Sequence, residues 1–292
     1  MNNTKPKLAL ALGILCISIF PILVRLQLTN GLISAFYRMF IAGLLLLPYI
    51  IVTKKFQLPK TNLFLLSCLC GIVFATDIAI WNIAIQKSTA TQATLLANLS
   101  PVWVGMGSFF FLKNKPTTNF WMGTIIALLG MAILVGIETF AQLNFDLAFV
   151  LALLSGILYA TYILISKNLL TQLDVLSFMS LVLFSSSIFL ALVCSITGEN
   201  FTGFTPTAWL VLFVQGAICQ LTAWLLISYA TQHLKATRVS LSLLGQAVLA
   251  TLLAWILLGE KMSWDRILGA VFLLLGIRVT FYDKRIGFKK SK

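Results

Sequence analysis

The sequence predicts an all-α polytopic membrane protein, with ten transmembrane helices arranged as two inverted five-helix repeats. Three observations lead to this fold class. The 292 residues are 60% hydrophobic and only 10% charged. The apolar residues form runs that approach the ~20 residues needed to cross a ~30 Å hydrocarbon layer, and the chain matches itself at a fixed offset. A soluble core of this length cannot bury so much apolar surface, so lipid must cover the excess.

Charged or turn-rich points divide the chain into ten apolar segments. The shorter ones still reach across a bilayer when their ends lie at the interface. The expected spans are 7–25, 32–53, 62–86, 91–112, 119–138, 145–167, 173–197, 206–231, 236–258 and 264–283. Because ten is an even number, both termini are expected on the same side.

The positive residues are distributed unequally between the two sides of this segmentation. Sixteen of the 21 Lys and Arg residues fall on the side of the termini, and only Arg25, Lys87, Lys261 and Arg266 fall on the other. Positive loops stay in the cytoplasm, so we expect a bacterial inner membrane protein with both termini cytoplasmic. The net charge of +13 then reflects topology, whereas nucleic-acid binding needs cations clustered on one solvated face.

A shift of 146 residues aligns the two halves of the chain without a gap. The informative matches are those of Gln, Thr, Lys and Gly, because Leu matches mean little in apolar segments. They pair Gln86 with Gln232, Thr91 with Thr237, Lys115 with Lys261, Gly123 with Gly269, and Gly130 with Gly276. The expected repeats are 1–140 and 145–285, followed by a basic tail at 286–292. Five helices are an odd number, so the second repeat enters the membrane from the opposite face, as in many carriers.

Two short motifs add a family resemblance to this organisation. Tyr37-Arg38 lies early in the second span, and Leu257-Leu258-Gly259-Glu260-Lys261 joins the last two spans. With ten spans in two halves, the chain resembles the drug/metabolite transporter superfamily in its EamA branch. The first half departs from the pattern, since Lys113-Asn114 stands where the second has Gly259-Glu260. The resemblance implies a cavity enclosed by helices 1 to 4 and 6 to 9, with helices 5 and 10 at the periphery.

Asp77 is the most informative position, because a carboxylate about 13 Å deep in a span is costly and marks ion, proton or substrate paths. Trp81 and Asn82 follow it by about one turn and are expected to add an aromatic wall and an amide. Arg38, about 9 Å deep in the second span, lies at a similar level. The two charges either form a fixed pair that only compensates two buried ions or bind substrate and tune each other.

Other polar and aromatic residues are weaker candidates for the same cavity. Asn98 and Gln246 are preferred, since an amide binds either end of a zwitterion, although interhelical hydrogen bonding explains many polar residues in spans. Pro21 and Pro101 are expected to kink their helices, as hinges or as static bends. The remaining candidates, which packing or lipid contact also explains, are Tyr159, Tyr162, Gln220 and Trp224.

The function expected is that of a secondary transporter for small organic metabolites, such as amino acids exported by alternating access. An importer is the alternative within transport. A non-transport membrane protein or an intramembrane enzyme is the alternative from another class, although the spans offer one acid and no histidine for catalysis. No metal or other cofactor is expected, because the five Cys residues and His233 lack ligand spacing. The expected partners are a small-molecule substrate and the bilayer, with a homodimer left open.

Overall fold

The computed structural model describes residues 4–24, 26–54, 56–87, 95–112, 115–136, 146–259 and 262–282. Within these ranges the regular structure is entirely helical. Eight helices there are long and apolar enough to cross a membrane, by length and composition, and Leu95–Phe111 is a shorter apolar helix. The last helix, α15, has 17 residues. The all-helical, polytopic class predicted from the sequence is thereby confirmed.

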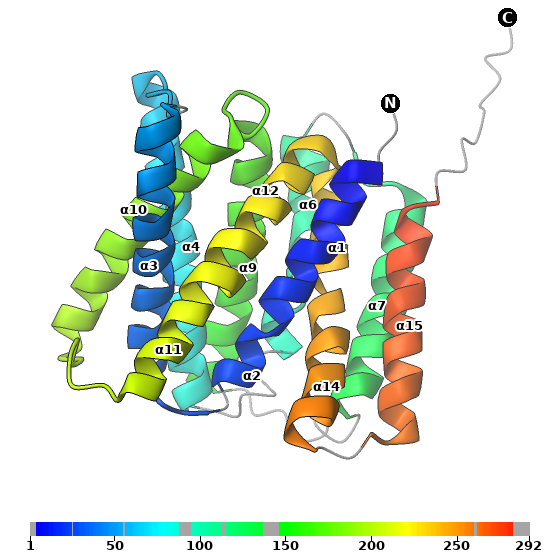
Figure 1. Cartoon of the computed structure of the whole chain (residues 1–292). Coiled ribbons are helices and arrows are strands. Elements are labelled where there is room, and N and C mark those ends of the chain that lie inside the picture. The colour runs from blue at the N-terminus through cyan, green and yellow to red at the C-terminus, as the bar shows by residue number, and fades with distance from the viewer. Residues whose placement is uncertain are drawn as a thin grey trace, which may run out of the picture.

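The helices run roughly side by side as one bundle (Figure 1). Their bounds are α1 Thr4–Ser18, α2 Phe20–Val24, α3 Gly31–Thr53, α4 Thr61–Lys87, α6 Ser100–Phe111, α7 Thr118–Val135, α9 Leu147–Leu169, α10 Val175–Ile196, α11 Pro206–Val214, η1 Gln215–Thr222, α12 Ala223–His233, α13 Ala236–Leu243, α14 Gly245–Leu258 and α15 Trp264–Thr280.

Polar caps define where several spans begin. The Asn30 side chain accepts a hydrogen bond from the Leu32 N–H at 3.0 Å, and Asp146 accepts one from the Phe149 N–H at 2.9 Å. Asp174 caps α10 in the same way. Each cap satisfies an N–H group that the first helical turn leaves without a partner. These side chains explain why short polar segments interrupt an otherwise apolar chain at these points.

Two expected spans are interrupted near their prolines. The first breaks at Ile19, so that α1 and α2 are separate helices and Pro21 lies in the first turn of α2. In the fourth, residues 98–99 form a turn and Pro101 lies in the first turn of α6. Proline has no N–H and its ring clashes with the preceding turn. The expected spans 7–25 and 91–112 are therefore interrupted where their prolines predicted a kink; residue 25 of the first and residues 91–94 of the second lie outside the described ranges.

Two further irregularities occur in the second half of the chain. The expected span 236–258 is divided at Leu244 into α13 and α14, without a proline. The expected span 206–231 is continuous, but its middle, η1, is a π-helix. Such wide turns are rare and are often found at functional sites. The break at Leu244 lies 146 residues after Asn98, so helices of the two halves are interrupted at matching positions.

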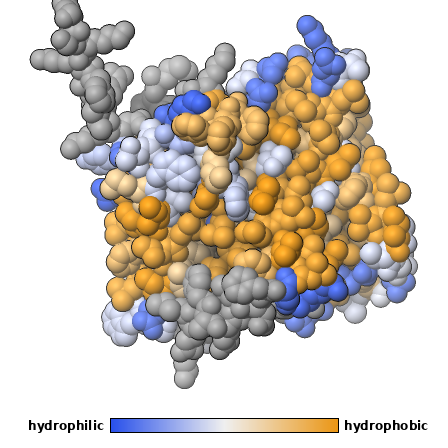
Figure 2. All heavy atoms as spheres, turned by 180° about the vertical axis from the view of Figure 1, so that it is seen from behind, coloured by the Kyte–Doolittle hydropathy of each residue, from blue (hydrophilic) through white to orange (hydrophobic). Residues whose placement is uncertain are grey.

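The interior and the periphery of the bundle differ in their side chains. Met39, Phe74, Met179 and other apolar residues of α3, α4, α9, α10 and α12 form the main buried cluster. Large apolar side chains such as Phe111 and Ile196 remain 82% and 84% exposed. Figure 2 shows apolar atoms over most of one face, with hydrophilic residues near its upper and lower edges. This is the distribution expected of a protein surrounded by lipid.

Glycines bring α7 and α15 into close contact at one edge of the bundle (Figure 1). A Cβ atom added to Gly123 would lie 2.5 Å from the Gly276 carbonyl oxygen, and one added to Gly130 would lie 2.7 Å from that of Gly269. The contacts are reciprocal and run in opposite directions along the two helices, which are therefore antiparallel. Small residues permit such close approach. The two helices occupy the peripheral position that the resemblance implies for helices 5 and 10.

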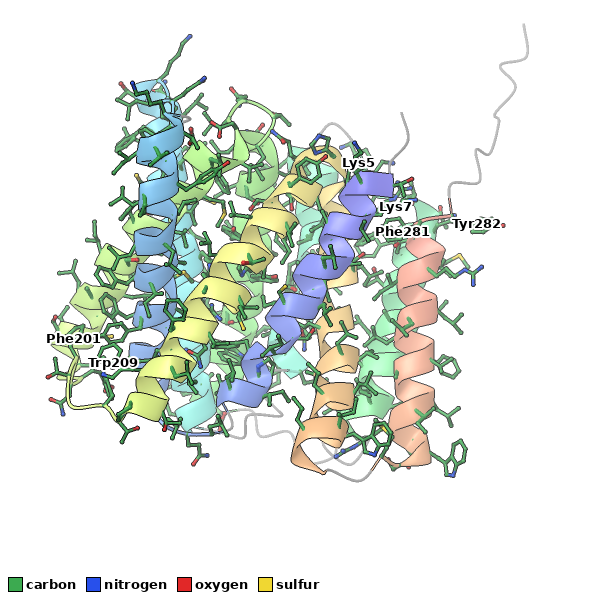
Figure 3. The ribbon with its side chains drawn as sticks, viewed as in Figure 1. Lys5, Lys7, Phe201, Trp209, Phe281 and Tyr282 are labelled. Carbon is green, nitrogen blue, oxygen red and sulfur yellow. The ribbon has the colours of Figure 1, made fainter. Side chains whose placement is uncertain are left out.

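The two ends of the described chain lie at one end of the bundle. The Lys7 ammonium is 5.4 Å from the centroid of the Phe281 ring, which directly follows α15. Figure 3 shows Lys5, Lys7, Phe281 and Tyr282 at this end and Phe201 and Trp209 at the other. Aromatic residues at both ends match the interfacial belts of membrane proteins.

Candidate functional site

The deepest charged group of α4 is held by a serine of α9. Asp77 is buried, and the Ser155 hydroxyl donates a hydrogen bond of 2.5 Å to its Oδ1 atom. Helices α4 and α9 pack along each other, which brings these two residues together across 78 positions of sequence. A carboxylate accepts several hydrogen bonds when it is ionised. The serine therefore leaves most of the acceptor capacity of Asp77 available to another group.

Arg38 of α3 lies near this carboxylate without pairing to it. The guanidinium carbon lies 4.3 Å from the centroid of the Phe20 ring, beside the break between α1 and α2. Arg38 interacts electrostatically with Asp77 and Tyr159, yet its Nε atom is buried without a hydrogen-bond partner. Both residues belong to the described part of the chain, and the structure records no ion pair between them. A direct Arg38–Asp77 salt bridge, one of the two alternatives left open by the sequence, is thus not observed in this structure.

An aromatic wall stands beside the Asp77–Ser155 contact. The Trp224 ring centroid lies 4.8 Å from that of Phe74 and 5.4 Å from that of Tyr162, both in edge-on geometry. Tyr159 is 6.3 Å from Trp224. Phe74 precedes Asp77 by one helical turn, and Tyr159 follows Ser155 by one, so the wall and the acid share helix faces. Three of the sequence candidates, Tyr159, Tyr162 and Trp224, are thus brought together.

Polar atoms without partners border the same region. Gln220, in the π-helix η1, has no exposed surface, and neither its Nε2 nor its Oε1 atom has a partner. The indole Nε1 of Trp224, one turn further on, is also buried and unpartnered. In contrast, Gln215 of the same π-helix accepts a 2.7 Å hydrogen bond from Ser34. Buried polar groups in native proteins are nearly always paired, and those that are not require an explanation.

The two amides preferred from the sequence lie at the helix breaks. Asn98 is in the turn that precedes α6, and Gln246 is near the start of α14. The first break packs on α9, where a Cβ atom on Gly156 would lie 3.1 Å from the Ala97 carbonyl oxygen. Gly156 directly follows Ser155. The break that holds Asn98 therefore adjoins the level of the Asp77 carboxylate.

Two sequence candidates lie away from the aromatic wall. The Asn82 amide donates to the Ile78 carbonyl at 2.8 Å, and its side chain fills the space beside Gly31. Trp81 is half-buried and has no ring contact with another described aromatic residue. Trp81 follows Asp77 by four residues and Asn82, less in phase, by five, and both lie nearer the end of α4. The structure assigns Asn82 a packing role.

Sequence reasoning missed three residues of this region: Ser155, Phe74 and Phe20. The first two carried a usable signal, because each lies one turn from a residue already selected, Tyr159 and Asp77 respectively. Phe20 had none, since its contact with Arg38 depends on the break at Ile19. Among the described residues, no three His, Cys, Asp or Glu side chains converge as a metal site would require. The chemistry on offer is ionic, amide and aromatic recognition.

Taken together, the helical fold and its apolar periphery define a polytopic membrane protein. The sequence profile of the EamA-like transporter family matches residues 5–136 and again residues 146–282. The chain belongs to the EamA-like transporter family, within the drug/metabolite transporter superfamily. The family and the relatives are transporters and not enzymes, which excludes the alternative of an intramembrane enzyme.

Several curated relatives share most of their length with this chain. An uncharacterized transporter of Clostridium kluyveri is 25% identical over 254 residues, 84% of this chain and 81% of the relative. One from Archaeoglobus fulgidus is 24% identical over 284 residues, 95% and 98% of the two chains. An S-adenosylmethionine uptake transporter of Rickettsia bellii is 24% identical over 259 residues, 88% and 86%. A solved crystal structure, 16% identical, has a TM-score of 0.82 and covers 96% of this chain and 98% of its own, which establishes the fold.

Proposed function

We propose that this chain is a secondary transporter of amino acids or related small metabolites, and that the layer around Asp77 binds the substrate. One observation supports this most directly: Asp77 and Arg38 are opposite charges, both buried on neighbouring helices, that leave each other unpaired. Burying a charge without its partner is costly. The arrangement is explained if a substrate completes both pairs.

The chemistry of the layer fits a zwitterion. A substrate ammonium would pair with the Asp77 carboxylate and a substrate carboxylate with the Arg38 guanidinium, whose planar fork matches that group. Gln220 and the Trp224 indole N–H would supply hydrogen bonds that have no partner without substrate. The rings of Phe74, Tyr159 and Trp224 would contact the apolar or aromatic part of the molecule.

Alternating access by two inverted five-helix repeats is the proposed mechanism. Shifted by 146 positions, α3, α6 and α7 coincide with α10, α14 and α15 to within about three residues at each end, and α4 coincides with the span Pro206–His233. The same shift converts the Gly123–Gly276 contact into the Gly269–Gly130 contact. A two-fold axis that exchanges antiparallel helices lies perpendicular to them, in the membrane plane. Ten spans of inverted topology are therefore supported, and interrupted helices near the midplane are common in such carriers.

A bacterial inner-membrane location with cytoplasmic termini is supported by the excess of Lys and Arg at the end of the bundle that holds Lys7 and Phe281. Export is the direction that the resemblance implies. Uptake is the second candidate, favoured by the relatives named S-adenosylmethionine uptake transporters in Rickettsia bellii and Rickettsia prowazekii. S-adenosylmethionine carries both an amino-acid group and an aromatic base; the charged groups of the proposed layer would pair with the first and its rings would contact the second. Alternating access is reversible, so the gradients set the direction.

The test is a ligand screen on the purified full chain, with the twenty amino acids and S-adenosylmethionine as probes beside neutral and purely cationic compounds of similar size. Ligand that binds only the folded protein raises its melting temperature, by an amount that grows with concentration over Kd. Any stabilising probe is then measured by counterflow in proteoliposomes. We expect at least one zwitterion to stabilise the protein and to exchange. If no zwitterion does so while a neutral or purely cationic compound exchanges, the proposed substrate class is wrong.

A further inference from the structure

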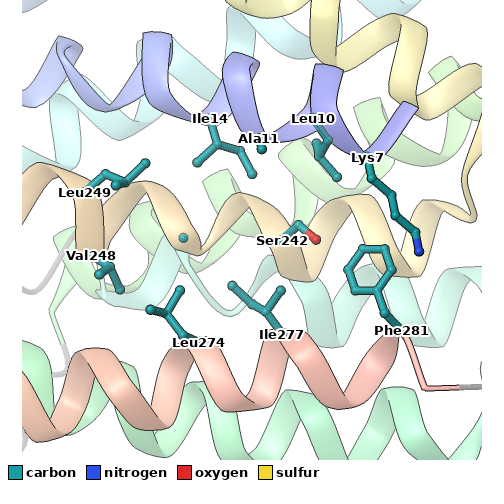
Figure 4. Close-up of a pocket in the computed structure, with 11 residues that line it drawn as sticks. Lys7, Leu10, Ala11, Ile14, Ser242, Val248, Leu249, Leu274, Ile277 and Phe281 are labelled. Atoms are coloured by element: carbon teal, nitrogen blue, oxygen red, sulfur yellow. The ribbon is translucent and has the colours of Figure 1, made fainter. Parts of the chain in front are cut away.

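A recess, separate from the layer around Asp77, opens on the side of the bundle. It has a volume of about 370 Å³ and lies between α1, the α13–α14 pair and α15 (Figure 4). The walls are almost entirely apolar, with Leu10 and Ile14 on α1, Leu249 on α14 and Ile277 on α15. The recess extends along about two turns, or about 10 Å, of each helix. We call it the lateral groove.

The lateral groove lies within the apolar belt. Ala11 of α1 and Leu274 of α15, which line it, are exposed, and Leu275 beside Leu274 is 47% exposed as well. In the hydrocarbon layer there is no water to fill such a recess. A lipid acyl chain is apolar, is present in that layer and is about as wide as an apolar side chain, so it fits the groove.

One end of the groove is marked by two cations around one ring. The Lys7 ammonium and the Arg238 guanidinium carbon each lie 5.4 Å from the centroid of the Phe281 ring. The Arg238 Nε atom donates to the Thr280 carbonyl at 3.2 Å, which fixes the guanidinium at this position. Figure 4 shows Lys7 and Phe281 together at the same end of the recess. Lys7 lines the groove and Arg238 adjoins it through the Phe281 ring, so an anionic group at this mouth would lie near both positive charges.

Ser242 adds a polar position between this mouth and the apolar interior. Its side chain lines the groove, only 5% of its surface is exposed, and its hydroxyl has no hydrogen-bond partner. A buried hydroxyl without a partner is unfavourable. The sequence of groups along the groove is therefore cationic, then a hydrogen-bond donor, then apolar. This order matches the phosphate, the ester carbonyl and the acyl chain of a phospholipid.

We propose that the lateral groove binds one anionic phospholipid, with its phosphate beside Lys7 and Arg238, an ester oxygen at Ser242 and an acyl chain against the apolar walls. The bound lipid contacts α1 of the first half and α13, α14 and α15 of the second. It lies against Gly245, which directly follows the break at Leu244. The lipid therefore stabilises the packing of the two halves next to an interrupted helix.

The test is native mass spectrometry of the purified full-length protein, titrated with phosphatidylglycerol or with phosphatidylcholine of the same acyl chains. We expect one phosphatidylglycerol to be retained preferentially. A surface cation contributes about fivefold to the affinity for an anionic lipid, so Lys7→Gln should weaken retention about fivefold and Lys7→Gln with Arg238→Gln roughly 25-fold. Ala11→Phe, which fills the groove, should lower the binding of both lipids.

Lys60→Gln is the matched control, because Lys60 is an exposed cation before α4 and does not line the groove. It should leave retention unchanged. Equal retention of the two lipids by the unmodified protein, or undiminished phosphatidylglycerol binding by Lys7→Gln and by Ala11→Phe, would overturn the proposal. Displacement of the lipid by inorganic phosphate would also do so, since the cations alone would then be the site. The double variant also removes the hydrogen bond from Arg238 to the Thr280 carbonyl, and this loss could disturb the fold. The single Lys7→Gln variant keeps that bond and therefore tests the charge alone.

Discussion

Two regions of the molecule differ in whether the two halves of the chain contribute equivalent residues. They are the glycine contacts between α7 and α15 and the polar layer around Asp77. At the first, both halves contribute the same residues, since Gly123 and Gly130 correspond to Gly269 and Gly276. At the second they do not. Shifted by 146 positions, Asp77 corresponds to Ala223 and Arg38 to Phe184. Close packing of two helix backbones keeps the halves alike, whereas binding an asymmetric molecule requires them to differ.

The same contrast is visible at two matching helix crossings. Helix α4 crosses α9 with the Asp77–Ser155 hydrogen bond, and α1 crosses α12 at Gly13, where an added Cβ would lie 3.0 Å from the Ala223 carbonyl oxygen. One crossing is polar and the other is apolar and tightly packed. Substitutions at the glycines should therefore affect folding, and substitutions in the polar layer should affect binding and transport with the fold retained.

The largest effect on stability is expected at the contact between α7 and α15. In Gly276→Ala the new Cβ would lie 2.5 Å from backbone atoms of both Gly123 and Ala127, so one helix must move. Overpacking of this kind costs about 1–3 kcal/mol or more. Gly43→Ala is the matched control, since its nearest neighbour would be the Phe184 ring at 3.6 Å. The melting temperature should fall clearly for Gly276→Ala and hardly for Gly43→Ala. Equal shifts in the two variants would contradict the proposed role of the glycines in helix packing.

Removal of the Arg38 charge should weaken binding of the zwitterionic probe more than the Trp224 and Gln220 substitutions described below. A hydrogen bond to a charged group contributes about 1.5–3 kcal/mol, so Arg38→Gln should raise the apparent Kd of a zwitterionic probe by at least about tenfold. Arg38→Lys keeps the charge but loses the planar contact with Phe20. Its Kd should lie between those of the unmodified protein and Arg38→Gln. The melting-temperature titration measures all three proteins. Unchanged affinity in Arg38→Gln would remove the arginine from the site.

Loss of the Trp224 indole N–H should have a smaller effect. Trp224→Phe keeps a ring against Phe74 and Tyr162 but removes one unpartnered donor. A neutral hydrogen bond contributes about 1 kcal/mol, so affinity should fall about fivefold. Trp209→Phe, in the aromatic cluster near Phe204 at the other end of the bundle, serves as the control and should bind normally. If both variants bind alike, the indole donor does not face the substrate.

Replacement of Gln220 by leucine should raise the stability of the protein and lower its affinity for the probe. Gln220→Leu removes two buried polar atoms without partners, each of which is unfavourable in the ligand-free protein. The melting temperature without ligand should therefore rise by a few degrees, while probe affinity falls about fivefold. Gln215→Leu, which breaks the hydrogen bond with Ser34, should instead lower stability. A destabilised Gln220→Leu protein would show that the amide has a structural partner.

The sequence predicted the helical class and most span boundaries because apolar runs, N-caps such as Asp146 and turn residues are local signals. It singled out Asp77, Arg38 and the aromatic residues as candidates because a charge or large ring inside a span stands out. It failed where the outcome depends on distant segments. Whether Arg38 pairs with Asp77 or lies over Phe20 is decided by how α2 and α3 pack, and no spacing along the chain contains that information.

The helix breaks show the same limit. Pro21 and Pro101 predicted kinks at nearly the right places, since proline acts locally. The break at Leu244 and the π-helix at 215–222 have no such residue. The first becomes visible only by comparison with its counterpart in the other half, near Asn98. An internal repeat therefore carries structural information that neither copy shows alone.

The central claim, that the layer around Asp77 is the substrate site, is tested most directly by counterflow in proteoliposomes that contain Asp77→Asn. Asp174→Asn is the control, because asparagine also caps a helix such as α10. We predict that exchange of the zwitterionic probe falls at least about 100-fold in Asp77→Asn, with its melting temperature nearly unchanged, and is retained in Asp174→Asn. Exchange by Asp77→Asn at the rate of the unmodified protein would contradict the account.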